Sequence, residues 1–128
     1  MLVASGLEQG PATPSFRDHA SFRASLTATV IVAGGVDSTA PGCRIVAIDW
    51  RPLAGAARYQ VQVRVGAHGA WVAVAGDSRC GQDAAVVGPT AFHDRVVRPA
   101  PRRYYRVVAV GTDGRSLDVT TVVPVDVR

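Results

Sequence analysis

The stretch from Tyr104 to Arg115, YYRVVAVGTDGR, decides the fold that this sequence predicts. Its opening residues alternate in character, and successive side chains of a β-strand point to opposite faces of a sheet. One parity suits a protein core: Tyr105, Val107 and Ala109. The other parity faces outward: Tyr104, Arg106 and Val108. The glycines and the aspartate of segment 111–114 then predict a tight turn, so that a strand over 116–127 completes a β-hairpin.

The same kind of alternation predicts strands before this hairpin. The clearest is 58–65, RYQVQVRV, in which Tyr59 and the valines point inward while the glutamines point outward. Further strands are expected at 26–33, 44–50, 70–75 and 90–97, and a polar loop at 76–88. This makes about seven strands, separated by turn residues, with no convincing helix. Such a pattern is typical of a seven-stranded antiparallel β-sandwich.

Residues 1–24 differ from the rest because glycines and prolines interrupt any regular element there. We therefore expect an extended N-terminal arm over 1–24 and one sandwich domain over 25–128. Phe16 and Phe22, each within a Ser-Phe-Arg triplet, are the aromatic side chains of this polar arm. Two interpretations stay open: the rings fold back onto their own domain, or they anchor the arm on a neighbouring subunit.

Composition limits the class of protein. The 128 residues suffice for a single domain. No stretch is apolar enough to span a bilayer, and the first residues lack the pattern of a secretory signal. The net charge of +4 is modest and aromatic residues are scarce, so neither nucleic acid nor a membrane is an expected partner.

Motifs for catalysis are missing from the sequence. The histidines, at positions 19, 68 and 93, have no partner at metal-ligand spacing, and no phosphate-binding glycine loop or nucleophile elbow is found. His93 and Asp94 are neighbours in an expected strand, where they face opposite ways, which predicts a surface pair instead of a catalytic dyad. We therefore expect no catalytic, cofactor-binding or metal-binding residues and no enzymatic activity.

The two cysteines, Cys43 and Cys80, are too far apart in sequence for a metal-binding or redox CxxC motif. Two interpretations remain. They form a single disulfide, or they are two unpaired thiols. A bridge over such a loop would stabilise the fold by about 3–4 kcal/mol in the chain-entropy model.

From Leu26 to Arg128 the sequence resembles a fibronectin type III domain. The landmarks are Trp50 in IDWRP, Tyr59 in GAARYQVQV, Trp71 in the next expected strand, and YYRVVAVGTDGRS. The resemblance implies that Trp50 and Tyr59 are core residues, with Trp50 packed between the sheets. Arg103 departs from the family, which has a tyrosine at that position. The resemblance implies a binding or structural role and no reaction.

A cluster of arginines accompanies the last hairpin: Arg95, Arg98, Arg102, Arg103 and Arg106. A solubilising surface is the simplest explanation, and a site for an acidic protein or an anionic glycan is the alternative. Tyr104 lies within the cluster, and Val108 and Val110 are expected to form an apolar strip beside it. The residues predicted to bind a partner are therefore Phe16, Phe22, Arg103, Tyr104, Arg106 and Val108.

The expected function is that of a non-enzymatic structural or assembly protein. Its N-terminal arm would dock on neighbouring subunits, including copies of itself, as in a phage virion component of the head or tail. The alternative is an extracellular carbohydrate- or protein-binding module of a larger secreted protein. Neither role requires a cofactor.

Overall fold

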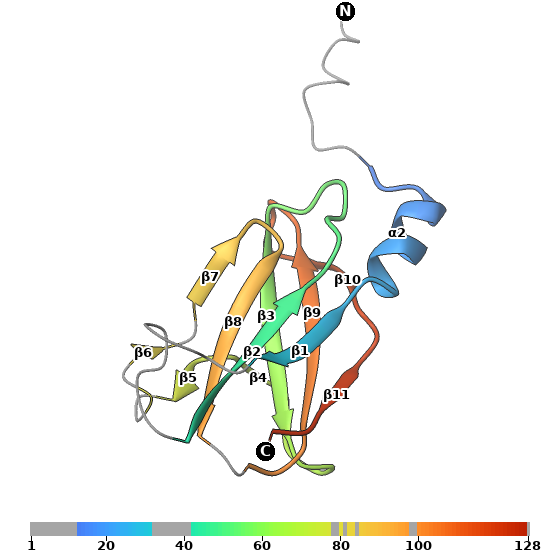
Figure 1. The fold of residues 1–128 in the computed structure, drawn as a ribbon. Coiled ribbons are helices and arrows are strands. Elements are labelled where there is room, and N and C mark those ends of the chain that lie inside the picture. Colours follow the sequence, from blue (N-terminus) through green and yellow to red (C-terminus); the bar gives the residue numbers. More distant parts are fainter. Residues whose placement is uncertain are drawn as a thin grey trace, which may run out of the picture.

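The computed structural model describes residues 13–31, 42–77, 80, 82–83, 85–97 and 100–127. Within them the chain forms one helix and eleven strands (Figure 1). In chain order these are α2 (Phe16–Arg23), β1 (Thr27–Ile31), β2 (Cys43–Asp49), β3 (Arg58–Val65), β4 (Val72–Ala73), β5 (Gly76–Asp77), β6 (Gln82–Asp83), β7 (Ala85–Gly88), β8 (Ala91–Val97), β9 (Arg103–Val110), β10 (Ser116–Val119) and β11 (Val123–Val125). Valine recurs in these strands because its branched side chain fits a pleated surface better than a helix.

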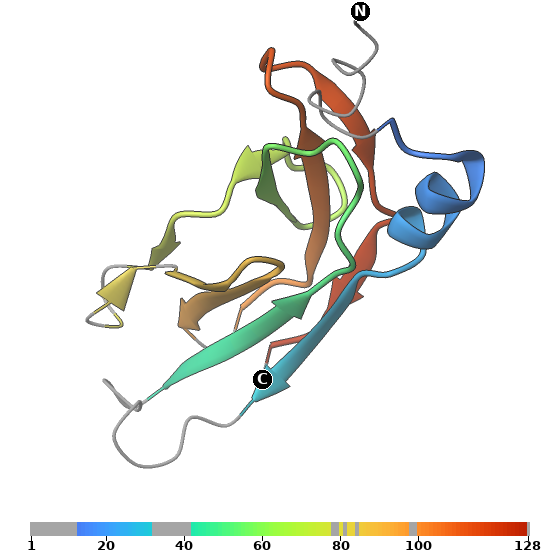
Figure 2. The same ribbon diagram turned by 90° about the horizontal axis from the view of Figure 1, so that it is seen from above.

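Two antiparallel sheets form the body of the molecule. The four-stranded sheet has the order β1-β2-β8-β7, and the five-stranded sheet has the order β10-β9-β3-β4, with β11 also paired to β9. The sheets lie face to face (Figure 1, Figure 2). The predicted all-β architecture of two packed antiparallel sheets is thereby confirmed.

The predicted number of seven strands is wrong. Among the described residues the two main sheets contain nine strands, and β5 with β6 forms a third sheet. The segment 76–88, expected to be a loop, contains β5, β6 and β7. The strand expected over 116–127 is divided into β10 and β11, because the hydroxyl of Thr120 replaces a backbone group and accepts the N–H of Val107 at 2.9 Å.

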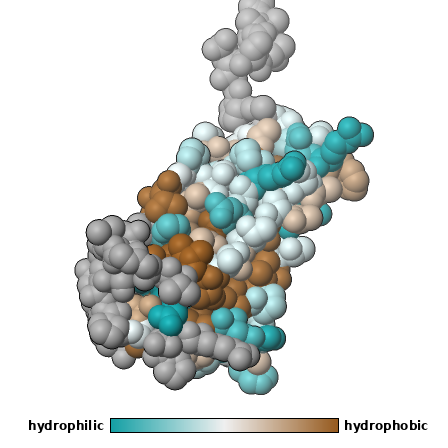
Figure 3. Space-filling view, viewed as in Figure 1, coloured by the Kyte–Doolittle hydropathy of each residue, from teal (hydrophilic) through white to brown (hydrophobic). Residues whose placement is uncertain are grey.

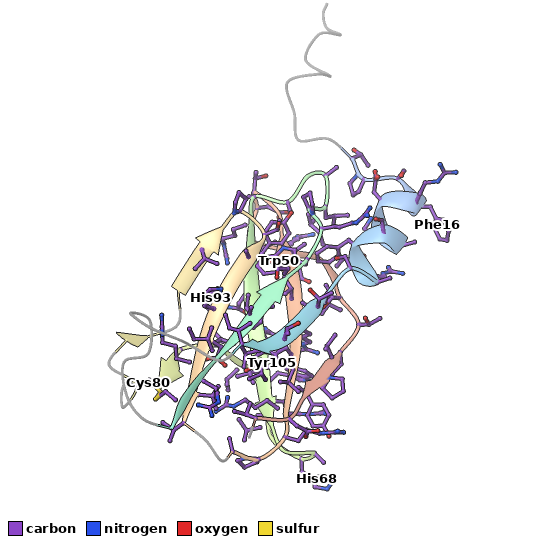
Figure 4. The ribbon with its side chains drawn as sticks, viewed as in Figure 1. Phe16, Trp50, His68, Cys80, His93 and Tyr105 are labelled. Carbon is purple, nitrogen blue, oxygen red and sulfur yellow. A yellow bond between two sulfur atoms is a disulfide. The ribbon has the colours of Figure 1, made fainter. Side chains whose placement is uncertain are left out.

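The core lies between the two sheets and uses the inward parity that the sequence predicts. Tyr105, Val107 and Ala109 of β9 are fully buried. Trp50, directly after β2, is 7 % exposed, and its ring meets that of Tyr59 edge-on, with 5.5 Å between centroids. Tyr59 is fixed from the other side, because its hydroxyl accepts the N–H of Leu53 at 2.9 Å. Figure 4 shows Trp50 and Tyr105 within the sandwich.

Val110, at the end of β9, does not face outward as predicted. It is 6 % exposed, although its neighbour Ala109 is buried as well. The register between β9 and β10 shifts between Ser116 and Asp118, opposite these two residues. Such a bulge distorts the ladder locally, so the alternation does not continue to the end of the strand.

The prediction of an extended arm is wrong for Phe16–Arg23, which form α2. Ser15 and Asp18 make a capping box at its start: the Ser15 hydroxyl accepts the N–H of Asp18, and the Asp18 carboxylate accepts the N–H of Ser15. The hydrogen bond from the Ser15 backbone lowers the pKa of Asp18 below its ordinary value. This reciprocal cap starts a helix directly after Pro14. The rest of the predicted arm, residues 1–12, lies outside the described residues.

Helix α2 is packed on its own domain. Phe22 is fully buried, with its ring centroid 6.2 Å from that of Tyr59, so the prediction that Phe22 anchors a neighbouring subunit is wrong. Asp118 of β10 accepts hydrogen bonds from Arg23 at 2.9 Å and lies 2.7 Å from Nδ1 of His19. Burial of Asp118 opposes its ionisation, but these contacts outweigh it and lower its pKa. Phe16, on the far side of α2, is 87 % exposed (Figure 4).

The two cysteines form a disulfide, which settles the alternative that the sequence left open. Cys43 begins β2, and Cys80 is fully buried, with 5.8 Å between their Cα atoms. The bond ties the segment around Cys80 to the four-stranded sheet at the side where β5 lies against β8. Arg95 of β8 is 9 % exposed, which excludes it from a surface cluster of arginines.

Candidate binding face of the five-stranded sheet

The pairing of β3 with β9 places the outward residues of the two strands side by side. Arg64 is opposite Tyr104, Gln62 is opposite Arg106, and Gln60 is opposite Val108. Residues directly opposite each other in a sheet share a face and are in contact range. In the flanking strands Pro124 is opposite Tyr104 and Val119 is opposite Val108. We call this surface the outer face, and its central residues are Arg64, Trp71, Tyr104, Arg106 and Val108.

Arginine and aromatic side chains are stacked on the outer face. The guanidinium carbon of Arg64 lies 4.7 Å from the ring centroid of Tyr104 and 5.2 Å from that of Trp71. The guanidinium carbon of Arg106 lies 4.2 Å from the same Trp71 ring. All three distances fall within the range of about 6 Å in which a ring attracts a cation. Trp71, directly before β4, therefore connects two charges that come from different strands.

A row of side-chain amides fixes the second of these arginines. Nε of Arg106 donates to Oε1 of Gln62 at 2.7 Å, and Nε2 of Gln62 donates to Oε1 of Gln60 at 2.7 Å. Nε of Arg64 is buried and has no hydrogen-bond acceptor in the described structure, so the two rings are its main neighbours. Both guanidinium groups are thus held in place before any partner binds, which reduces the entropy lost on binding.

The charges of Arg64 and Arg106 are not neutralised within the described part of the chain. Neither makes an ion pair there, in contrast to Arg102, whose Nε lies 2.9 Å from Asp126 at the end of the same face. That contact raises the pKa of Arg102. The outer face therefore combines two uncompensated positive charges with the apolar side chains of Val108, Val119 and Pro124 beside them.

The structure brings together only some of the residues predicted to bind a partner. Tyr104, Arg106 and Val108 share the outer face, as the alternation indicates. Arg103 does not, because it lies on the opposite parity and its Nη1 is 3.9 Å from Asp94 between the sheets. Arg98 lies outside the described residues. The predicted arginine cluster is therefore divided among different environments.

Sequence reasoning missed Arg64 and Trp71 as members of this face. The outward parity of RYQVQVRV contains Arg64, which was the available signal. Trp71 stood out in sequence as a landmark, but nothing local shows that its ring reaches two arginines. Only the register of β3 against β9, and the return of the chain through β4, places these side chains together.

A second polar group lies between the sheets. Asp94 is 1 % exposed and accepts a 2.6 Å hydrogen bond from the hydroxyl of Tyr105, so the prediction that His93 and Asp94 form a surface pair is wrong for Asp94. Burial and the neighbouring Asp94 raise the pKa of Tyr105, which keeps its phenol neutral and donating. The contact joins β8 to β9 and therefore one sheet to the other. Its enclosed position makes it a structural link.

The described residues hold no group of three or more histidine, cysteine, aspartate or glutamate side chains that could bind a metal ion. They also contain no helix with the length and apolar character needed to cross a membrane.

No family model, no curated protein and no solved structure matches this chain. The resemblance to fibronectin type III domains accordingly stays a prediction. What the coordinates establish is a sandwich of two antiparallel sheets whose outer face carries the stacked arginines.

Proposed function

We propose that this chain is a non-enzymatic binding module that docks on an acidic region of a partner protein through its outer face. The observation that carries the proposal is the stack of Arg64 and Arg106 on Trp71 and Tyr104. Fixed guanidinium groups present hydrogen-bond donors that match carboxylates. Tryptophan, tyrosine and arginine are also the residues that contribute most to binding at protein interfaces.

The composition of the outer face favours a protein over an anionic glycan or a nucleic acid. Sugars and bases bind by stacking on open aromatic rings, but the rings of Trp71 and Tyr104 are already stacked against arginine side chains. Val108, Val119 and Pro124 add an apolar patch next to the charges. Apolar contacts beside charged ones are usual in protein interfaces.

The disulfide supports a setting outside the reducing cytosol. Disulfides persist in secreted proteins and on the surfaces of cells and virions. Both roles considered from the sequence, a virion component and an extracellular module, satisfy this condition. We propose that docking uses the outer face and not the segment 16–23, because Phe22 and Arg23 of that segment are already engaged with the sandwich.

Binding of a defined acidic peptide tests the proposal. The probe is an unstructured peptide of glutamate and leucine residues, measured by calorimetry against its glutamine-for-glutamate counterpart. We expect saturable binding of the glutamate peptide that weakens with salt, and at least tenfold weaker binding of the glutamine peptide. The Arg64→Gln/Arg106→Gln double variant should lose most of this affinity, because both uncompensated charges are removed.

The control variant is Arg17→Gln/Arg115→Gln, which changes the net charge equally on exposed side chains elsewhere. It should bind the peptide like the unmodified protein. Equal loss in both double variants would show general charge attraction and refute the outer face as a site. Tighter binding of polygalacturonate or of single-stranded oligothymidylate than of the peptide would likewise refute a protein partner.

A further inference from the structure

A cavity of about 420 Å³ opens at one edge of the sandwich, away from the outer face. The rings of Trp50, Tyr59 and Phe92 line it, together with Val61, Val86 and Arg58. The indole N–H of Trp50 is buried without a hydrogen-bond acceptor in the described structure, so this wall contains an unused donor. Such an apolar lining with few polar groups is the usual character of a binding pocket.

The cavity lies where the two sheets are not closed against each other. On one side is β7, which among the described residues pairs with β8 alone and stands at the margin of the four-stranded sheet (Figure 1). On the other side is the start of β3, because β4 pairs with Gln62 and Val63, and the last contact described on that side is the N–H of Val74 donating to the carbonyl of Val61 at 3.0 Å. A strand at a sheet edge leaves a row of backbone N–H and C=O groups without partners.

The edge of β7 is short and its register with β8 shifts between Val86 and Gly88, but it carries neither of the side-chain types that protect many edge strands. Its four residues include no charged side chain and no proline, and Val86 and Val87 are 74 % and 51 % exposed. Figure 3 shows apolar side chains on this side of the molecule, over the four-stranded sheet. Two other edges are covered: β1 lies against β11, and β10 lies against α2.

We propose that the β7 edge and this cavity bind an extended segment of a partner protein. The segment pairs with β7 through backbone hydrogen bonds and lies across the mouth of the cavity, so that one large apolar side chain enters it. This is the mode of strand addition, in which the backbone gives affinity and a pocket gives specificity. The site is independent of the outer face.

Arg58 indicates that the partner segment also carries an acidic side chain. It lines the cavity, is exposed, and makes no ion pair in the described part of the chain. Side chains two positions apart in a strand share a face and lie about 6.6 Å from each other. A glutamate two residues from the apolar side chain therefore faces Arg58, and the recognised pattern is aromatic-x-glutamate.

The experiment uses the threonine-hosted peptide Thr-Thr-Phe-Thr-Glu-Thr with blocked ends. Titration is followed by the fluorescence of Trp50 in the Trp71→Phe protein, in which Trp50 is the remaining tryptophan. We expect a saturable change below millimolar peptide. Replacing the peptide's phenylalanine by alanine should weaken binding at least tenfold. A peptide with phenylalanine and glutamate adjacent should also bind weakly, because the two side chains then face opposite ways.

Two protein variants test the edge and the charge. Val86→Lys adds a charge to the exposed edge and should weaken binding at least tenfold, whereas Val72→Lys, on the exposed β4, should leave it unchanged. Arg58→Gln should weaken binding of the glutamate peptide about threefold, as expected for an exposed ion pair. It should not affect a peptide with glutamine in that position.

Three results would overturn the proposal. The first is no saturable signal at 1 mM peptide in the folded protein. The second is equal loss in Val86→Lys and Val72→Lys. The third is a concentration-dependent dimer, seen by light scattering and abolished by Val86→Lys alone, because the β7 edge is then occupied by a second copy of the chain. The Arg64→Gln/Arg106→Gln variant should still bind the phenylalanine–glutamate peptide, because this site does not include the outer face. Failure of one proposal therefore leaves the other standing.

Discussion

The two faces of β9 use the same kinds of side chain for opposite purposes. Tyr105 and Arg103 point between the sheets, where Tyr105 donates to the buried Asp94 at 2.6 Å and Arg103 lies near the same carboxylate. Tyr104 and Arg106 point outward, where the guanidinium groups of Arg64 and Arg106 stack on aromatic rings and make no ion pair within the described part of the chain. Neighbouring residues of one strand thus take part in two kinds of contact: buried ones that involve a carboxylate of the chain itself, and outward ones in which the arginines have no ion-pair partner within the described part of the chain.

This difference separates what stabilises the molecule from what remains available for binding. Inside, Tyr105 and Arg103 are directed at a carboxylate of the chain itself, because a buried charge without partners is costly. Outside, the guanidinium groups of Arg64 and Arg106 stack on aromatic rings and are only half-buried, so they do not require a carboxylate of the chain. The outer face can therefore keep its charges for a partner, and substitutions on the two faces should have different consequences.

The largest expected effect comes from truncating the two tyrosines separately. Tyr105→Ala leaves a cavity in the core and removes the donor to Asp94, and should lower the free energy of unfolding by about 3–5 kcal/mol. Tyr104→Ala removes one half-buried cation–π contact, with Arg64, and should cost about 1 kcal/mol. Urea denaturation of both variants measures this comparison. Equal losses would mean that the faces of β9 are not divided as described.

Alkaline pH should act on the inner face of β9 through Tyr105. Burial and Asp94 raise the pKa of Tyr105 above its ordinary value near 10. The phenol of the unfolded chain therefore ionises at a pH where the folded one does not, and stability that is complete below pH 10 is lost as pH rises further. The loss from this group should approach about 1.4 kcal/mol per pH unit above pH 10.

The Tyr105→Phe variant isolates this contribution, because it lacks the titrating group. At pH 8 it should be less stable than the unmodified protein by about 1.5–3 kcal/mol, since it has lost a hydrogen bond to a charged acceptor. Above pH 10 the difference in free energy of unfolding should shrink. A difference that stays constant up to pH 11 would contradict the raised pKa of Tyr105.

Sequence alone predicted the inner face well because a strand buried on one face has apolar side chains at every second position. The alternation in β3 and β9 indicated which residues enter the core, Tyr105 among them, whereas the core position of Trp50 was expected from the family resemblance. Helix α2 was missed because its eight residues carry a weak apolar pattern, and burial of Phe22 contributes more than helix propensity. The capping box of Ser15 and Asp18 was the signal available for it.

The outer face could be predicted only in part. Periodicity assigned Tyr104, Arg106 and Val108 to it, but not their contacts, which depend on cross-strand register and on the return of the chain to Trp71. Arg103 shares the inward parity of Tyr105, so the alternation indicated its side, but its contact with Asp94 depends on a strand of the other sheet. Polar contacts between distant strands leave no periodic pattern in the sequence.

A smaller effect is expected on the stability of the Arg64→Gln/Arg106→Gln variant. Three cation–π contacts of about 0.5–1 kcal/mol each are removed and glutamine keeps part of the packing, so urea denaturation should show a loss of about 1–2 kcal/mol. Arg103→Gln, on the same strand as Arg106 but facing Asp94, should cost more although it removes fewer charges. If the outward double variant were the less stable protein, the stacked arginines would belong to the framework of the fold. Stability of the fold alone would then explain why Arg64 and Arg106 are present without ion-pair partners in the described part of the chain, and a binding partner would not be needed.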